Sequence, residues 1–275
     1  MVKLTAFADE ISPDFKVQLD TLEAEGIKHI EFRGAWGTGV LQLSDEQLDQ
    51  VQEMMEERGF KLSSIGSPIG KIMITDDFEP HLKDFERALA IAQRFHAPYI
   101  RIFSFFIPKD EDPARYREEV MRRMAVLVKR AEEAGITLLH ENEKGIYGDT
   151  AERCLDILQT CQSSRLRCAF DPANFVQCNV KPYTEAFPLL ESYIDYLHIK
   201  DALFKDHSVV PAGEGDGEVK DVLQAMKDKH YSGFQSLEPH LAHAGKYSGF
   251  SGPDLFQVAS KALKKLLDEL NEPWE

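Results

Sequence analysis

Eight short apolar segments alternate with longer amphipathic segments along the 275 residues of this chain. Each apolar segment has the length of a β-strand, and each amphipathic segment has the period and the capping residues of a helix. Strands separated by helices run parallel, because each helix returns the chain to the same end of the sheet. The expected strands are 4–10, 29–34, 61–67, 99–105, 136–143, 166–172, 194–200 and 233–240.

Capping residues indicate where several of the helices begin and end. Ser12 as N-cap with Pro13 at the first helical position predicts a helix that stops at Gly26. Ser44 with Gln47 forms a capping-box pattern that begins the second helix, and Gly59 ends it. The remaining helices are expected at about 77–95, 113–135, 149–161, from 183 towards 194, 219–229 and 253–270.

Eight strand-then-helix units of this total length fit a TIM (β/α)8 barrel, which typically needs about 250 residues. An open doubly wound sheet is the competing α/β architecture. It favours a glycine-rich turn after the first strand, and the segment ADEISPD contains no glycine. No linker-like segment or block of charge divides the chain. We therefore expect one α/β domain over residues 1–275, a parallel eight-stranded barrel with outer helices.

Charge and composition exclude several classes of function. The chain has 32 Lys and Arg against 47 Asp and Glu, a formal net charge of −15. Such a surface repels phosphate backbones and anionic membranes, so neither nucleic acid nor a membrane is an expected partner. The N-terminal segment lacks the apolar core of a signal peptide, which predicts a cytoplasmic protein. The four cysteines form no C-x-x-C pair and are expected to be reduced.

Metal-ligand residue types stand at the ends of the last four expected strands: Glu141, Asp171, His198 and Glu238. Taken singly, each could cap a helix or lie in a solvated loop. Chemistry in a TIM barrel is placed at the C-terminal ends of strands, and neighbouring strands lie about 4.8 Å apart, so the four side chains can converge. Three carboxylates and one imidazole suit a single divalent cation, Mn²⁺, Mg²⁺, Co²⁺ or Zn²⁺.

Further polar residues near the strand ends are candidates for binding substrate. Lys200 shares the side of its strand with His198 and could instead pair with a ligand carboxylate. Arg33 and Arg101 could bind an acidic substrate group or neutralise the acidic cluster. The predicted substrate-binding residues are Arg33, Lys71, Arg101, Asn174, Lys200, Glu214 and His240.

The chain resembles the xylose isomerase-like TIM barrel superfamily, which includes sugar phosphate isomerase/epimerase-like proteins and type 2 AP endonucleases. Five motifs carry the resemblance: LLHENEKGIYGDT, CAFDPANFVQCNVKPY, YLHIKDA, VVPAGEGDGEV and SLEPHL. It implies that Glu141, Asp171, His198 and Glu238 bind one divalent metal, with Glu141 and Glu238 as the catalytic acid/base pair. The implied activity is the isomerisation or epimerisation of a sugar or small keto acid through a metal-stabilised enediolate.

Other functions remain open at this stage. A dehydratase or lyase of the inosose-dehydratase or keto-glycoside-cleaving type would use the same metal site and differ in the fate of the β-substituent. An AP endonuclease would need more metal ligands and a basic face. The resemblance implies an Asp-x-His pair of further ligands near residue 206, whereas Asp206 and His207 are adjacent here, and the net charge is −15. A non-enzymatic barrel is disfavoured because both glutamates are present. A homo-oligomer would fit, since superfamily members are often dimers or tetramers.

Overall fold

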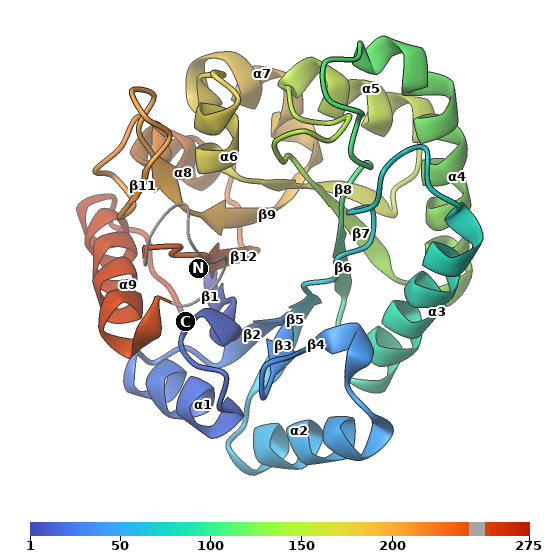
Figure 1. The fold of residues 1–275 in the computed structure, drawn as a ribbon. Helices are drawn as coiled ribbons and strands as arrows, with labels where there is room; N and C mark the ends of the chain where they lie inside the picture. The colour runs from blue at the N-terminus through green and yellow to red at the C-terminus, as the bar shows by residue number, and fades with distance from the viewer. Residues whose placement is uncertain (242–250) are drawn as a thin grey trace.

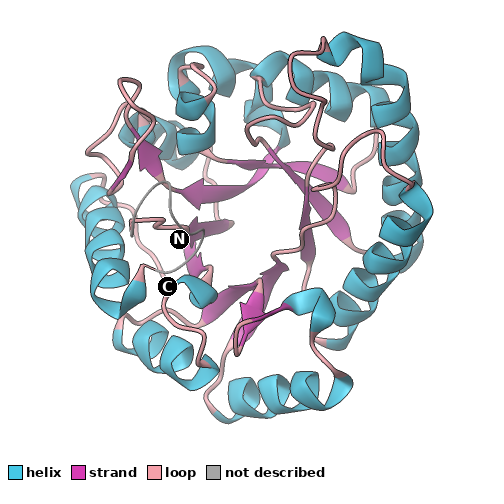
Figure 2. Ribbon diagram, in the orientation of Figure 1, coloured by secondary structure: helices cyan, strands magenta, loops and turns pink. Residues whose placement is uncertain are grey.

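The computed structural model describes residues 1–241 and 251–275 as a barrel of parallel strands within a ring of helices (Figures 1 and 2). The eight strands pair in the order β1-β12-β9-β8-β7-β6-β5-β2, and a bridge from Phe7 to Glu31 joins the two outermost strands. The predicted TIM barrel is therefore confirmed. Its strands are β1 (Lys3–Ala6), β2 (His29–Phe32), β5 (Lys61–Ile65), β6 (Tyr99–Ile102), β7 (Thr137–Glu141), β8 (Leu166–Phe170), β9 (Ile194–Ile199) and β12 (Phe234–Leu237).

Long amphipathic helices cover the outer face of the barrel and bury their apolar sides against it (Figure 2). None of the described helices has the length and apolar composition needed to cross a bilayer. The main helices are α1 (Phe15–Ala24), α2 (Asp45–Glu57), α3 (Phe78–Arg94), α4 (Arg117–Ala134), α5 (Ala151–Cys161), α7 (Phe187–Leu190), α8 (Val219–Asp228) and α9 (Gly252–Glu269).

The expected helix boundaries hold at α2 and shift at α1. The Ser44 side chain accepts from the Gln47 amide while the Gln47 side chain accepts from the Ser44 amide, so the predicted capping box is present. The predicted N-cap of the first helix, Ser12, was wrong. Asp14 caps α1 by accepting from the Lys16 and Val17 amides. A carboxylate at this position satisfies two free amides at once, which leaves Pro13 outside the helix.

The expected helix from residue 183 is broken into three short pieces, namely a π-turn η4 (Pro182–Ala186), α7 and a 3-10 turn η5 (Glu191–Tyr193). Several elements near the rim were not expected. Helix α6 (Pro172–Gln177) follows β8 directly, with Asp171 as its N-cap. Two hairpins, β3 (Gly34–Ala35) with β4 (Thr38–Gly39) and β10 (Asp201–Ala202) with β11 (Val209–Val210), rise from the ends of β2 and β9.

The barrel interior below the rim is filled with side chains. Leu139, Ala169 and Tyr196 form its apolar centre, and each is fully buried. A polar chain crosses the same layer, where Ser63 Oγ lies 2.7 Å from Thr5 Oγ1 and 2.9 Å from the Tyr196 hydroxyl. Because the middle of the barrel is packed, a ligand can reach polar groups only at an end of the strands.

Candidate active site

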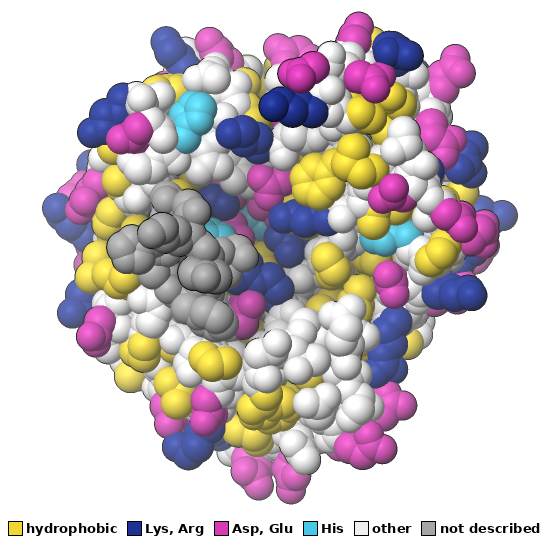
Figure 3. Space-filling model, in the orientation of Figure 1, with side chains coloured by type: hydrophobic (Ala, Val, Ile, Leu, Met, Phe, Trp, Pro, Cys, Tyr) yellow, Lys and Arg dark blue, Asp and Glu magenta, His cyan; other side chains and the backbone are white. Residues whose placement is uncertain are grey.

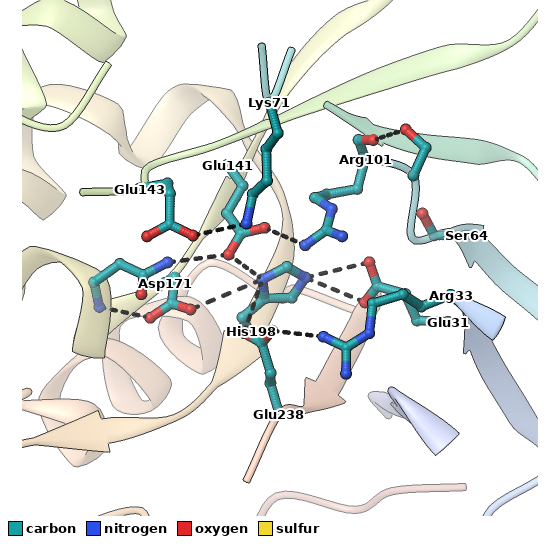
Figure 4. A network of polar contacts seen from close by, with 12 residues as sticks. Glu31, Arg33, Ser64, Lys71, Arg101, Glu141, Glu143, Asp171, His198 and Glu238 are labelled. Carbon is teal, nitrogen blue, oxygen red and sulfur yellow. Dashed lines mark hydrogen bonds and ion pairs between the residues drawn. The ribbon is translucent and has the colours of Figure 1, made fainter. Parts of the chain in front are cut away.

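Four side chains meet at the C-terminal rim of the barrel (Figure 4). One ligand atom from each of Glu141, Asp171, His198 and Glu238 lies within 4.8 Å of the other three, and all four residues are buried. Their strands β7, β8, β9 and β12 are consecutive neighbours in the sheet. The register of parallel strands thus brings together the four residues that the strand-end pattern selected.

The orientation of His198 suits a cation between these side chains. Its Nε2 lies 3.1 and 3.3 Å from the two oxygens of Glu31, a fully buried residue of β2. In the neutral form that binds a metal, the ring would donate from Nε2 to Glu31 and present the lone pair of Nδ1 to the carboxylates, where Glu141 Oε1 lies 3.2 Å from it. Among the described residues Nδ1 has no hydrogen-bond partner. A carboxylate that orients a histidine in this way is typical of metal sites, so these residues fit a divalent ion.

Opposing effects set the protonation of the carboxyl groups. Burial by itself would raise the pKa of Glu238, but Lys200 and His240 hold it well below its usual range. Burial likewise opposes the ionisation of Glu141, whose pKa is nevertheless lowered by His198 and Arg101. Both glutamates are therefore carboxylates at neutral pH, the form that binds a metal.

Five of the predicted substrate-binding residues contact the four-residue cluster directly, beginning with Lys200, Arg101 and Asn174. Lys200 Nζ lies 2.8 Å from both Asp171 Oδ2 and Glu238 Oε2, so it forms the ion pairs that were the alternative to substrate binding. Arg101 Nη1 donates to Glu141 Oε2 at 2.7 Å, and Asn174 Nδ2 donates to Glu141 Oε1 at 3.1 Å. These contacts orient the carboxylates around a common centre.

A second group of charges extends the site beyond Glu238. His240 Nε2 lies 3.0 Å from Glu238 Oε1 and 3.2 Å from Glu10 Oε1. Arg33 Nη1 lies 3.4 Å from Glu238 Oε1, while its Nε donates to Asp9 Oδ2 at 2.7 Å. The side chains of Arg33 and His240 are about a quarter exposed, at 24% and 25%, so both can be reached by a ligand in the barrel mouth.

The last two predicted substrate-binding residues, Lys71 and Glu214, lie at different distances from the cluster. Lys71 reaches over the rim, where its Nζ lies 3.1 Å from Glu143 Oε2 (Figure 4). Glu214 is exposed, and the structure does not bring its side chain to the cluster. The loop that contains Glu214 is held instead by Asp201, whose carboxylate accepts from the amides of Gly213, Gly215 and Gly217 at 2.8–3.0 Å.

Residues 19–266 match the family model of xylose isomerase-like TIM barrels. The chain belongs to this family. A D-tagatose 3-epimerase-like protein superposes on it with a TM-score of 0.80 and 19% identity, covering 98% of this chain and 99% of the other. The IOLI protein with a bound zinc atom gives 0.78 and 18%, again over 98% and 99%. The probable 3-DHS dehydratase AsbF of Bacillus anthracis gives 0.75 and 19%, over 96% and 99%.

Because these three proteins share only 18–19% sequence identity with the chain, the superpositions show a common fold and nothing more. No curated protein sequence matches the chain significantly. The assignment to the xylose isomerase-like family confirms the resemblance found in the sequence motifs. The reaction and substrate of this member must therefore be argued from its own residues.

Sequence reasoning missed several residues of this candidate site in the xylose isomerase-like barrel. Glu31 stands two positions before Arg33 in the second strand, so strand alternation could have placed both on the inner face. Glu10 follows the first strand and accepts from the His240 amide at 2.9 Å. Asp201 directly follows Lys200 but turns to the loop amides. Only the partners from other strands distinguish such residues from ordinary loop acids.

Proposed function

We propose that this chain, acting as one domain over residues 1–275, is a divalent-metal-dependent isomerase or epimerase of a sugar or small keto acid. The observation that carries the proposal is the convergence of four buried ligand-type residues at one rim, with His198 oriented by Glu31. Glu141, Asp171, His198 and Glu238 would hold one ion. The epimerase-like, zinc-bound and dehydratase neighbours support an enzyme with a divalent metal.

The ion, when bound, supplies Lewis-acid chemistry that stabilises negative charge on the oxygens of a hydroxy ketone. Glu141 and Glu238 come from β7 and β12, with β8 and β9 between them in the sheet. A substrate held over the rim would therefore have one carboxylate on each side. One glutamate would remove the proton next to the carbonyl, and the other would return a proton to the opposite face or to the neighbouring carbon.

Lys200 is placed to assist this proton transfer. Its ammonium group lies 2.8 Å from Glu238 Oε2 and is only 7% exposed. A buried cation at this point favours the ionised form of Glu238 before the proton is taken up. It could also donate to a substrate oxygen on which negative charge develops.

One contact favours elimination as a second candidate reaction. A dehydratase or lyase must protonate a leaving hydroxyl or aglycone as well as remove the proton next to the carbonyl. His240 Nε2 lies 3.0 Å from Glu238 Oε1, and the side chain of His240 is 25% exposed. His240 is therefore a candidate acid for the leaving group, with Glu238 as the base.

Hydrogen exchange in D₂O separates these reactions. Ketoses, keto-inositols and small hydroxy keto acids are incubated with the chain and Mn²⁺, Mg²⁺, Co²⁺ or Zn²⁺, and proton NMR follows the hydrogen next to the carbonyl. Metal-dependent exchange with an intact carbon skeleton supports the isomerase or epimerase. Loss of water or of an aglycone supports the lyase. Exchange that is unchanged by a chelator would contradict the proposal.

A further inference from the structure

Three cations and two phenyl rings alternate along the rim on the side of β1, β2, β5 and β6. The Arg33 guanidinium carbon lies 4.7 Å from the centre of the Phe7 ring, and the Arg101 carbon lies 5.1 Å from the same ring. Arg101 also lies 4.5 Å from the Phe103 ring, and Lys71 Nζ lies 4.2 Å from it. We call Arg33, Phe7, Arg101, Phe103 and Lys71 the cation–aromatic ladder. All four distances are within the range of cation–π attraction.

Among residues 1–241 and 251–275, the ladder has a hydrogen-bond donor without a partner. Arg101 is only 4% exposed, and in the described part of the chain its Nε has no hydrogen-bond partner. A guanidinium group carries five N–H donors, and Arg101 uses Nη1 for Glu141. Lys71 has one ion pair, to Glu143, and its side chain is 35% exposed. Figure 3 shows basic side chains gathered in the hollow at the centre of this face.

The segment that carries Lys71 is held rigidly. Gly70 has φ +91°, and a Cβ on it would lie 2.0 Å from the Phe103 carbonyl oxygen. The Gly70 amide donates to His81 Nε2 at 2.7 Å, and the Phe105 amide donates to the Gly70 carbonyl at 3.0 Å. A fixed lysine suits the binding of a ligand, because little order is lost on binding.

The ladder lies immediately beside the four-residue cluster. Glu141 connects them, because its Oε2 accepts from Arg101 while its Oε1 lies 3.2 Å from His198 Nδ1. A group bound by Arg101 and Lys71 is therefore only a few bonds away from a carbonyl held over the cluster. The planar fork of an arginine matches a carboxylate. A phosphate dianion would meet stronger repulsion from Glu141 and Glu143, which lie beside the same two cations.

We propose that the cation–aromatic ladder binds a carboxylate of the substrate, so that the substrate is a small acidic hydroxy ketone rather than a neutral sugar. This inference rests on the proposed function, which it narrows. The carboxylate would take donors from Arg101 and Lys71. Arg33 stacks on Phe7 at the other end of the ladder, where Asp9, Glu10 and Glu238 already balance its charge.

Three ligands that share a hydroxymethyl ketone test the inference: neutral dihydroxyacetone, its carboxylate counterpart hydroxypyruvate, and dihydroxyacetone phosphate. Binding to the full chain with Mn²⁺ is measured by calorimetry, and exchange is measured in D₂O. Hydroxypyruvate should bind about tenfold or more tightly than either other ligand, because charge-assisted hydrogen bonds are the strong ones. Equal binding of the neutral ligand, or equally tight binding of the phosphate, would overturn the inference.

Variants distinguish the ladder from the metal, which could itself attract a carboxylate. Lys71→Gln should reduce the preference for hydroxypyruvate over dihydroxyacetone about tenfold. Lys144→Gln removes an exposed lysine next to Glu143 and should leave the preference unchanged. If Lys71→Gln keeps the preference for hydroxypyruvate over dihydroxyacetone, the metal is the source of that preference and the inference is overturned.

The two readouts keep this inference separate from the proposed function. Preferential binding of hydroxypyruvate without exchange would support the ladder and contradict the proposed chemistry. Metal-dependent exchange with equal affinity for the neutral and carboxylate ligands would support the chemistry and overturn the ladder.

Discussion

The two halves of the barrel rim carry different chemistry. The ends of β7, β8, β9 and β12 supply three carboxylates and an imidazole, all buried, around one centre. The ends of β1, β2, β5 and β6 supply the cation–aromatic ladder, together with Glu31 and Glu10, which pair with His198 and His240. One half is thus suited to a divalent cation and the other to an anion. Because the chain has a net charge of −15, an anion can be bound only where basic side chains are gathered locally, as they are along the ladder.

The halves also differ in how their side chains are held. On the metal side, hydrogen bonds between side chains set the geometry, as between Asn174 and Glu141 and between Lys200 and Glu238. On the ladder side, the geometry depends on ring stacking and on the backbone around Gly70. Substitutions on the metal side should therefore affect the chemistry first. Substitutions on the ladder side should affect folding and substrate preference first.

The largest effect is expected for Glu238→Gln. The substitution keeps the shape of the side chain but removes the charge and the proposed base, so exchange in D₂O should fall by about a thousandfold or more. Metal affinity, measured by Mn²⁺ titration, should fall while binding remains detectable. Glu214→Gln is the matched control, because Glu214 is exposed and away from the cluster. Exchange near the wild-type rate in Glu238→Gln would refute the acid/base assignment.

Gly70→Ala, in the ladder half, should lower the free energy of unfolding of the protein by about 2–5 kcal/mol, as measured by denaturant unfolding. The estimate combines the cost of a left-handed residue, about 1–2 kcal/mol, with overpacking against Phe103, about 1–3 kcal/mol. Gly59→Ala is the control, since Gly59 has φ +71° but open space around its Cβ position. It should cost about 1–2 kcal/mol. Equal costs for both variants would show that the Phe103 contact does not constrain this segment.

A buried histidine behind the metal half should make the protein sensitive to acid. Burial lowers the pKa of His140 from 6.5 to about 4. Between these values the unfolded chain binds a proton that the folded chain does not, so the free energy of unfolding falls as the pH falls. The loss should reach about 3 kcal/mol near pH 4 and be absent above pH 6.5.

His140→Leu should remove most of this acid sensitivity, as measured by urea unfolding between pH 7 and 4. His230→Asn is the control, because His230 is exposed and its φ of +58° is tolerated by asparagine. An unchanged pH dependence in His140→Leu would show that other groups cause the acid response.

The smallest effect is expected in the loop after β11. Asp201→Asn replaces an acceptor oxygen by an amide group that faces backbone N–H donors, which should cost about 1–3 kcal/mol. Faster hydrogen exchange at Gly213, Gly215 and Gly217 would localise the change. Asp216→Asn is the control in the same loop, since Asp216 accepts from a single amide, that of Phe204, within the described part of the chain. Equal exchange in both variants would argue against a special role for Asp201.

The sequence by itself determined the barrel and selected the four ligand-type residues that meet on one side of its rim. Eight strand-and-helix units require parallel strands, and parallel strands put their C-terminal residues at one edge. The last residue of each expected strand can be identified in the sequence. Glu141, Asp171, His198 and Glu238 could therefore be selected from their positions alone. The alternation of side chains also placed Lys200 on the side of His198.

Only the tertiary structure decided how these residues are used. The pairing of His198 with Glu31 and the stacking of Arg101 on Phe7 join strands that are far apart in the chain. The sequence allowed Lys200 to bind substrate or to neutralise an acid, and the distances show that it contacts two carboxylates. Such choices depend on separations of a few ångströms between elements. Those separations are set by how the whole barrel closes and packs, which no local pattern encodes.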